Sequence, residues 1–187
     1  MTEIAQQTLQ EHLAEVARKS SRPGGCAVAT VAATEACALI SMVANFTKAD
    51  LSDILSRAKA SRSRLLELAD EDGVAFAAVM ATYDGKGDLE PALRQAAQVP
   101  ISAMEICIAH LEDLALLAEQ GNRKLTTDVA IAACLLRSAL ECCRFNVLIN
   151  VRSMKLNTSD FVKALASIDC DVDRCDLISK KILKELA

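Results

Sequence analysis

TDVAIAACLLRSALECCRFNVLINVR, residues 127–152, is apolar on nearly every side when it is drawn as a helix. It contains no glycine or proline and is rich in alanine and leucine, which favour the helical state. A helix that is apolar all round must be covered by its neighbours, so we expect this one near the centre of a helical bundle. Residues 26–46 form a second stretch of the same kind and predict a second largely buried helix.

The remainder of the chain also has the pattern of helices. Only three prolines and six glycines interrupt 187 residues, and turn-forming clusters separate the apolar segments. We therefore predict an all-α, compact bundle of about six or more helices that forms one domain over residues 1–187. The predicted helices cover residues 3–20, 26–46, 51–82, 89–119, 127–152 and 159–186. Pro100 lacks an N–H group and is expected to kink or divide the fourth of them.

Composition excludes several classes of protein. With 52% hydrophobic and 25% charged residues, the chain is too apolar to be disordered. Its net charge is −4, so it has no excess of cations to bind a phosphate backbone. With four Phe, one Tyr and no Trp it also lacks an aromatic surface on which the bases of a nucleic acid could stack. The two apolar stretches carry charges, Glu35 in the first and Arg137, Glu141 and Arg144 in the second, so we expect buried helices rather than membrane spans.

The cysteine pattern argues against disulfides and metals. Eight cysteines lie mostly within apolar stretches, and no CxxC pair is present. The two histidines, His12 and His110, are far in sequence from each other and from any cysteine pair, so no metal site is expected. The chain also begins without a basic and apolar leader segment. We interpret the cysteines as reduced, buried thiols of a cytoplasmic protein that has no metal or redox cofactor.

One carboxylate is exceptional in the predicted helix 51–82. At about 100° per residue the apolar side chains of this helix form one stripe, and Asp72 falls near the centre of that stripe. A buried lone charge is costly, so Asp72 should be paired, hydrogen-bonded, protonated or directed into a polar cleft. The alternative is that the helix turns there and Asp72 meets solvent or an arginine such as Arg62.

The central helix contains three informative polar residues. Asp128 lies in its first turn, where the helix dipole stabilises a carboxylate, and a helix-stabilising role alone would explain it. Asn146 and Asn150 are four residues apart and share a face, which predicts either a buried network or ligand contacts. Asp128 and Asn146 are ~27 Å apart along the axis, so only an extended ligand or a neighbouring subunit would connect them.

Five segments between residues 11 and 152 carry a more specific signal when they are taken in order. They are RPGGCAVA (22–29) with SMVANFT (41–47), DEDGVAF (70–76), VP (99–100), GN (121–122) with TDVAIA (127–132), and NVLIN (146–150). Together they resemble the cyclodeaminase/methenyltetrahydrofolate cyclohydrolase family.

The resemblance implies an all-helical homodimer that handles one-carbon units on tetrahydrofolate, with the folate derivative as substrate and no metal. The expected reaction is hydrolysis of 5,10-methenyltetrahydrofolate to 10-formyltetrahydrofolate, because the chain leaves no room for the formiminotransferase domain that often accompanies the other branch of the family. The alternative is a formiminotetrahydrofolate cyclodeaminase that releases ammonia. A third possibility is a noncatalytic folate-binding or interaction protein with a diverged site.

The resemblance also implies roles for individual residues. Both reactions pass through a tetrahedral carbon between two nitrogens and need a general base and a general acid, for which Asp128 and Asp72 lead and Asp70 follows because it falls off the apolar stripe. The turn before the second helix would present backbone N–H groups to the ligand. The candidate substrate-binding residues are Pro23, Gly24, Gly25 and Cys26 at this turn, Asn45, Asn122, Asn146 and Asn150 as hydrogen-bonding amides, and Lys48 for the glutamyl tail.

Three departures from the family pattern leave altered substrate or lost activity open. Cys26 and Ala27 replace a third glycine and a small polar residue, and the lysine-rich segment after Thr47 is shortened and lacks its tyrosine. Val129 and Ala130 replace a smaller Ala-Gly pair and add volume at the start of the central helix. Cys26 as a covalent nucleophile is disfavoured, because no histidine base lies in the matched segments.

Overall fold

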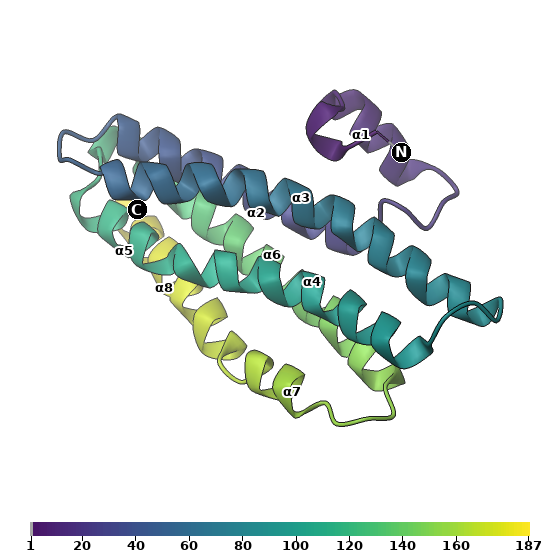
Figure 1. Ribbon diagram of the computed structural model, residues 1–187. Coiled ribbons are helices and arrows are strands. Elements are labelled where there is room, and N and C mark those ends of the chain that lie inside the picture. The colour runs from purple at the N-terminus through teal and green to yellow at the C-terminus, as the bar shows by residue number, and fades with distance from the viewer. Residues whose placement is uncertain (1) are drawn as a thin grey trace.

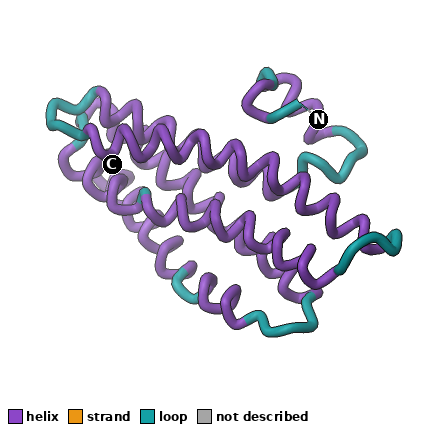
Figure 2. Tube along the Cα trace, viewed as in Figure 1, coloured by secondary structure: helices purple, strands orange, loops and turns teal. Residues whose placement is uncertain are grey.

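The computed structural model describes residues 2–187, and within them it contains helices and no strand (Figure 2). The α-helices are α1 (Leu9–Ala17), α2 (Gly25–Asn45), α3 (Ser52–Tyr83), α4 (Leu89–Ala109), α5 (Leu111–Gln120), α6 (Thr126–Ser153), α7 (Ser159–Leu165) and α8 (Ile168–Leu186), with short 3-10 helices η1 (Ile4–Gln6) and η2 (Arg123–Leu125). The predicted all-α bundle is therefore confirmed.

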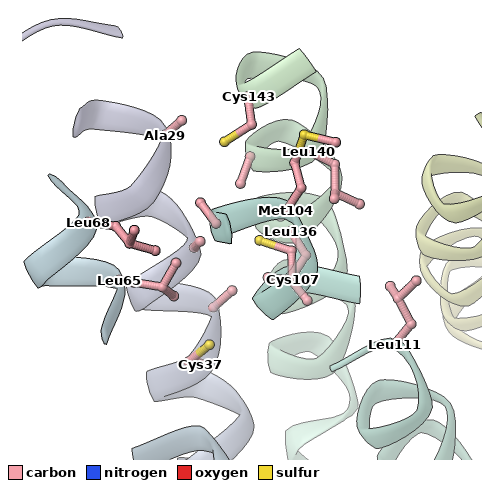
Figure 3. Close-up of a cluster of buried hydrophobic side chains, with 14 of the residues drawn as sticks. Ala29, Cys37, Leu65, Leu68, Met104, Cys107, Leu111, Leu136, Leu140 and Cys143 are labelled. Atoms are coloured by element: carbon pink, nitrogen blue, oxygen red, sulfur yellow. The ribbon is translucent and has the colours of Figure 1, made fainter. Parts of the chain in front are cut away.

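The long helices α2, α3, α4 and α6 run side by side and form the body of the bundle (Figure 1). Helix α6 packs against α2, α4 and α8, and α2 packs between α3 and α6. Figure 3 shows the core where these helices meet, with α2, α3, α4 and α6 each contributing buried side chains. The labelled side chains of these four helices are Ala29, Cys37, Leu65, Leu68, Met104, Cys107, Leu136, Leu140 and Cys143. The two apolar stretches thus provide the central helices, as predicted.

Helix α6 is not covered on every side, which corrects the expectation from its composition. Along one face it leaves large apolar side chains in solvent, among them Phe145 at 66% exposure and Ile149 at 62%. The sequence pattern cannot distinguish an apolar residue that packs inside the chain from one that lies on its surface.

Helix α2 is the one described helix long and apolar enough to cross a membrane by length and composition, with a mean hydropathy of 1.8 in its most apolar window. Of that window, 56% is buried inside the bundle. This is the environment of a core helix, and the absence of a membrane partner stays a prediction.

The predicted helix boundaries need three corrections. The expected helix 3–20 is divided into η1 and α1, because Thr8 and Glu11 form a reciprocal cap that starts a new helix. Helix α4 continues through Pro100, and the chain divides at His110 instead. The expected helix 159–186 is interrupted between α7 and α8.

The eight cysteines are all free thiols, and they are not all buried as expected. Five are buried: Cys26, Cys37, Cys107, Cys143 and Cys175. Three lie on the surface: Cys134, Cys142 and Cys170. Two of the exposed cysteines belong to the same uncovered face of α6 as Phe145.

A buried polar cluster ties α3 to the junction of α4 and α5. The fully buried His110 lies 2.8 Å from Asp113 through Nδ1 and 2.9 Å from the Ser61 hydroxyl through Nε2. Arg57 donates two hydrogen bonds to Asp113, at 3.0 and 2.5 Å. Burial alone would raise the pKa of Asp113, but the hydrogen bonds from His110 and Arg57 outweigh it, so that pKa lies below its ordinary value.

Replacing Asp113 by Ala should lower the free energy of unfolding by about 3 kcal/mol, because His110 and Arg57 lose a buried partner. Since the folded-state pKa of Asp113 is depressed, its contribution is present above the unfolded pKa and is lost as the pH falls through the folded one. Urea unfolding at pH 7 and at pH 3 measures both effects. Glu112→Ala, at the exposed neighbouring position, is the control; equal losses in the two variants would contradict the structural role.

Candidate functional site

A cavity of about 360 Å³ opens where the start of α2 meets the later part of α3, the early part of α4 and the end of α6. It is lined by Ser21, Gly24, Gly25, Cys26, Asp72, Phe76, Val79, Met80, Tyr83, Leu93, Ala96, Asn146, Ile149, Asn150 and Ser153. Six of the predicted site residues are therefore brought together, from segments far apart in the sequence.

Asp72 is the only carboxylate among the described residues that line the cavity. It is half-buried, and burial raises its pKa above the ordinary value, although a hydrogen bond from the Cys26 thiol acts in the opposite direction. No ion pair with Arg62 or any other cation is found for Asp72 within residues 2–187. Asp72 therefore faces a cleft and has a hydrogen bond from Cys26, and it is not paired with Arg62.

Asn146 and Asn150 approach the cavity from the last turns of α6. Their amide nitrogens donate to backbone carbonyls of the preceding turn, Asn146 to Cys142 at 2.9 Å and Asn150 to Asn146 at 2.8 Å. These bonds fix the direction of both amides, and no other side-chain bond of either is found among the described residues. Their carbonyl oxygens are thus the groups available to a ligand.

The start of α2 supplies backbone donors. Gly24 is the N-cap residue and gives no side-chain cap, so the first N–H groups of α2 have no partner from that residue. A Cβ atom added to Gly25 would meet nothing within 4 Å, which means that glycine keeps this position open beside the cavity. Such a helix start is suited to hold an oxygen that carries negative charge.

Cys26 is buried at this helix start, and its thiol is not activated. Burial raises its pKa far above the ordinary value, and the nearby Asp72 and Cys143 act in the same direction. A neutral thiol is a poor nucleophile. This agrees with the sequence argument against covalent catalysis by Cys26.

Asp70 and Pro23 lie in a separate hollow, against the N-terminal segment. The backbone N–H of Ile4 donates to the two carboxylate oxygens of Asp70 at 3.2 and 3.3 Å, so that carboxylate is occupied in holding η1 on α3. Close by, Arg22 donates to the Gly73 carbonyl at 2.9 Å. Asp70 does not line the Asp72 cavity, in keeping with its place off the apolar stripe.

Four predicted site residues lie at the opposite end of the bundle from the cavity: Asn45, Lys48, Asn122 and Asp128. Asn122 donates to the Phe46 carbonyl at 2.9 Å and caps η2, so it joins the end of α2 to the start of α6. Asp128 stands in the first turn of α6, where the dipole argument placed it. Within one chain it is ~27 Å along the axis from Asn146.

The apolar walls of the cavity were not identified from the sequence as part of a site. Phe76 and Val79 come from the same helical stripe as Asp72, and that stripe was interpreted only as core packing. Phe76 and Val79 follow Asp72 by four and seven residues and so share its face of the helix, and this spacing could have identified them as neighbours of Asp72 in the site. Tyr83 and Ser153 lie at helix ends where no periodic pattern marks them.

Two other groupings of side chains do not form a site. The trio Ser61, His110 and Asp113 has the order of a hydrolase triad, but it is largely buried and none of its members lines the cavity. Residues 2–187 contain no group of three or more His, Cys, Asp or Glu side chains placed to hold a metal ion. The absence of a metal cofactor stays a prediction.

Comparison with known proteins finds relatives with folate-related names. The chain is 26% identical over 168 residues to the methenyltetrahydrofolate cyclohydrolase of Methylorubrum extorquens. The matched region covers 79% of this chain and 81% of that protein. It is 30% identical to the formimidoyltransferase-cyclodeaminase of Sus scrofa over 83% of this chain, but it spans only 32% of that longer protein.

A solved structure matches almost the whole chain. The formiminotetrahydrofolate cyclodeaminase of Thermotoga maritima is 32% identical and superimposes with a TM-score of 0.92, covering 98% of this chain and 99% of that one. The family model described as formiminotransferase-cyclodeaminase matches residues 8–168. The chain therefore belongs to the formiminotransferase-cyclodeaminase family, as the order of its motifs indicated.

Proposed function

We propose that this protein is an enzyme of folate metabolism that hydrolyses 5,10-methenyltetrahydrofolate to 10-formyltetrahydrofolate. The observation that carries the proposal is Asp72, a carboxylate with a raised pKa in a cavity formed by the family's own motifs. The cyclohydrolase named among the relatives supports this reaction. The folate derivative is the substrate, and we propose no metal or redox cofactor, no nucleic-acid partner, a homodimer, and a cytoplasmic location.

The cavity offers the groups that this hydrolysis needs. Water adds to the methenyl carbon, which is bonded to two nitrogens and shares their positive charge, and a proton leaves the water as the tetrahedral carbon forms. The hydroxyl on that carbon then gives up its proton as the bond from the carbon to N5 breaks, N5 takes up a proton, and the formyl group remains on N10, so that one proton is released overall. In this proposal Asp72, the carboxylate of the cavity, stabilises the cation and transfers a proton. The first N–H groups of α2 are suited to the new oxygen.

The remaining lining residues fit a flat, partly polar ring system. Phe76, Val79, Met80 and Leu93 provide apolar walls, and Asn146 and Asn150 provide fixed amides at one side. This division of apolar surface and directed hydrogen bonds is typical of small-molecule sites. It matches a pterin, whose faces are apolar and whose edge carries donors and acceptors.

A second candidate reaction is the closure of formiminotetrahydrofolate with loss of ammonia. The Thermotoga maritima cyclodeaminase, which superimposes over nearly the whole chain, favours it. Both reactions pass through a tetrahedral carbon between N5 and N10, so Asp72 would serve either as the group that transfers protons. In the hydrolysis water is the nucleophile and N5 is the leaving group, whereas in the ring closure N10 attacks the formimino carbon and ammonia leaves. The choice between hydrolase and lyase chemistry rests on assay of the two substrates.

The purified protein should accelerate the loss of the methenyl absorbance of 5,10-methenyltetrahydrofolate above the spontaneous rate in the same buffer. The parallel assay supplies formiminotetrahydrofolate and measures ammonia. Faster hydrolysis supports the cyclohydrolase, and ammonia release alone supports the cyclodeaminase. Binding of the folate without turnover of either substrate would leave the noncatalytic alternative.

Asp72→Asn should lower turnover by about 100-fold or more, because the amide cannot transfer the proton. The folded protein should be at least as stable as wild type at pH 7: a raised folded-state pKa means that ionised Asp72 disfavours folding, and the neutral amide removes that penalty. Turnover and thermal unfolding are measured together. Glu71→Gln, an exposed neighbour on α3, is the control; similar turnover in both variants would remove Asp72 from the mechanism.

Cys26→Ser should keep turnover within about threefold of wild type, because the thiol is neutral and a hydroxyl can replace its hydrogen bond to Asp72. Steady-state kinetics on the folded variant provides the measurement. A loss as large as that of Asp72→Asn would make Cys26 a nucleophile after all.

A further inference from the structure

Part of the cavity wall comes from the last turn of α6, where a helix holds itself least firmly. Asn150 and Ser153 line the cavity from this turn, and α6 ends at Ser153. They lie opposite Leu93 and Ala96 of α4 in the same lining. The last carbonyl groups of a helix have no N–H partner further along it, so a terminal turn frays easily. A side chain that binds substrate from this turn therefore needs support from outside α6.

Glu90, in the first turn of α4, gives that support. In Figure 1 the end of α6 lies beside the start of α4, and the loop 154–158 leads from there to α7. The backbone N–H groups of Lys155 and Leu156 donate to the two carboxylate oxygens of Glu90, at 2.9 and 3.1 Å. No other acceptor for either N–H is found within residues 2–187. Both oxygens of Glu90 are thus used to hold the chain that leaves α6.

Arg94, one turn further along α4, holds the other end of the same loop. It donates to the Asn157 carbonyl at 2.8 Å and to the Asp160 carboxylate at 3.1 Å. Its guanidinium also lies over the ring of the buried Phe161, 5.0 Å from the centre of the ring. We call Glu90 and Arg94 together the α4 clasp, since they hold the loop from both ends.

The α4 clasp adjoins the cavity on both helices that it connects. On α4, Leu93 lines the cavity and lies three residues after Glu90 and one residue before Arg94. On α6, Ser153 lines it two residues before Lys155, the first residue that the clasp holds. Neither Glu90 nor Arg94 belongs to the lining. Any effect of the clasp on a ligand therefore passes through the residues that it holds in place.

We propose that Glu90 and Arg94 are positioning residues for folate binding, which keep the last turn of α6, and with it the Asn150 amide, in place against the α4 wall of the cavity. The inference rests on the proposed function for the identity of the ligand. The Asn150 amide nitrogen is occupied by the Asn146 carbonyl, so its oxygen is the atom left for the ligand. If the loop were released, the last turn would fray and this oxygen would lose its direction.

Kinetic constants separate this positioning role from the chemistry. Glu90→Ala should raise the KM for 5,10-methenyltetrahydrofolate about tenfold and leave kcat within about twofold, because Asp72 lies on α3, which the clasp does not hold. Arg94→Ala should act in the same direction, and the double variant should show less than the product of the two effects, since both residues hold one loop. Glu105→Ala, at an exposed position further along α4, is the control. A fall in kcat at unchanged KM overturns the inference.

A purely local role of Glu90 at the start of α4 predicts a different pattern. A carboxylate in the first turn stabilises a helix through its dipole, whereas a cation near that end does not. In that case Arg94→Ala would leave KM unchanged, and Glu90→Gln, which loses the charge, would resemble Glu90→Ala. The clasp predicts instead that Glu90→Gln lies between wild type and Glu90→Ala, because the amide keeps one acceptor oxygen for the loop. The first pattern would overturn the clasp.

Hydrogen exchange tests the physical step without any assay of turnover. The amides of residues 150–156 should exchange faster in Glu90→Ala than in wild type, while those of residues 129–143, in the packed part of α6, should keep their rates. Equal exchange at the end of α6 in the two proteins would overturn the proposal.

Titration calorimetry with tetrahydrofolate, which has the pterin but no one-carbon unit, measures binding directly. Glu90→Ala should weaken its affinity about tenfold, in line with the change in KM. If wild type is active and Glu90→Ala matches it in both KM and affinity, only the inference about the clasp fails. If wild type neither turns over either substrate nor binds tetrahydrofolate, the proposed function fails and this inference fails with it.

Discussion

The packing of α2 against α6 is the contact on which the other features of the molecule depend. Both helices bury an apolar face in the core, where small side chains such as Ala33 and Ala36 on α2 and Ala139 on α6 allow neighbouring helices to lie close together. Helices α3, α4 and α8 then pack against this pair and leave one face of α6 exposed. Because the pair runs the length of the bundle, the start of α2 reaches the last turns of α6, and that meeting point is the cavity.

The position of Asp72 follows from this packing and has an energetic cost. Helix α3 directs its apolar stripe at α2, and the stripe brings Asp72 to the cavity that Gly24 and Gly25 also line. Water is partly excluded there, which disfavours the ionised carboxylate. An apolar residue at this position would be more favourable for stability, so the presence of a carboxylate there points to a role in chemistry.

Much of this was predictable from local patterns, and the failures have physical reasons. Helical periodicity predicted the bundle, its two central helices and the exceptional place of Asp72, because these depend on spacing within one helix. The break at His110 was missed because it depends on contacts with Ser61 and Asp113 that are distant in sequence or buried. The open face of α6 was missed for a related reason. Composition shows that a side chain is apolar, but it does not show whether that side chain is buried inside the chain or exposed on its surface.

The N-terminal segment joins the wall of the cavity through only a few bonds. Helix α1 stands apart from the bundle in Figure 1. Two bonds join this segment to α3: η1 is held through Asp70, two residues before Asp72, and Arg22 donates to the carbonyl of Gly73, one residue after it. A fusion partner or affinity tag attached in front of α1 would therefore pull on the turn that shapes the site. The C-terminus ends beside α5, at the other end of the bundle, and is the better place to anchor the protein to a surface.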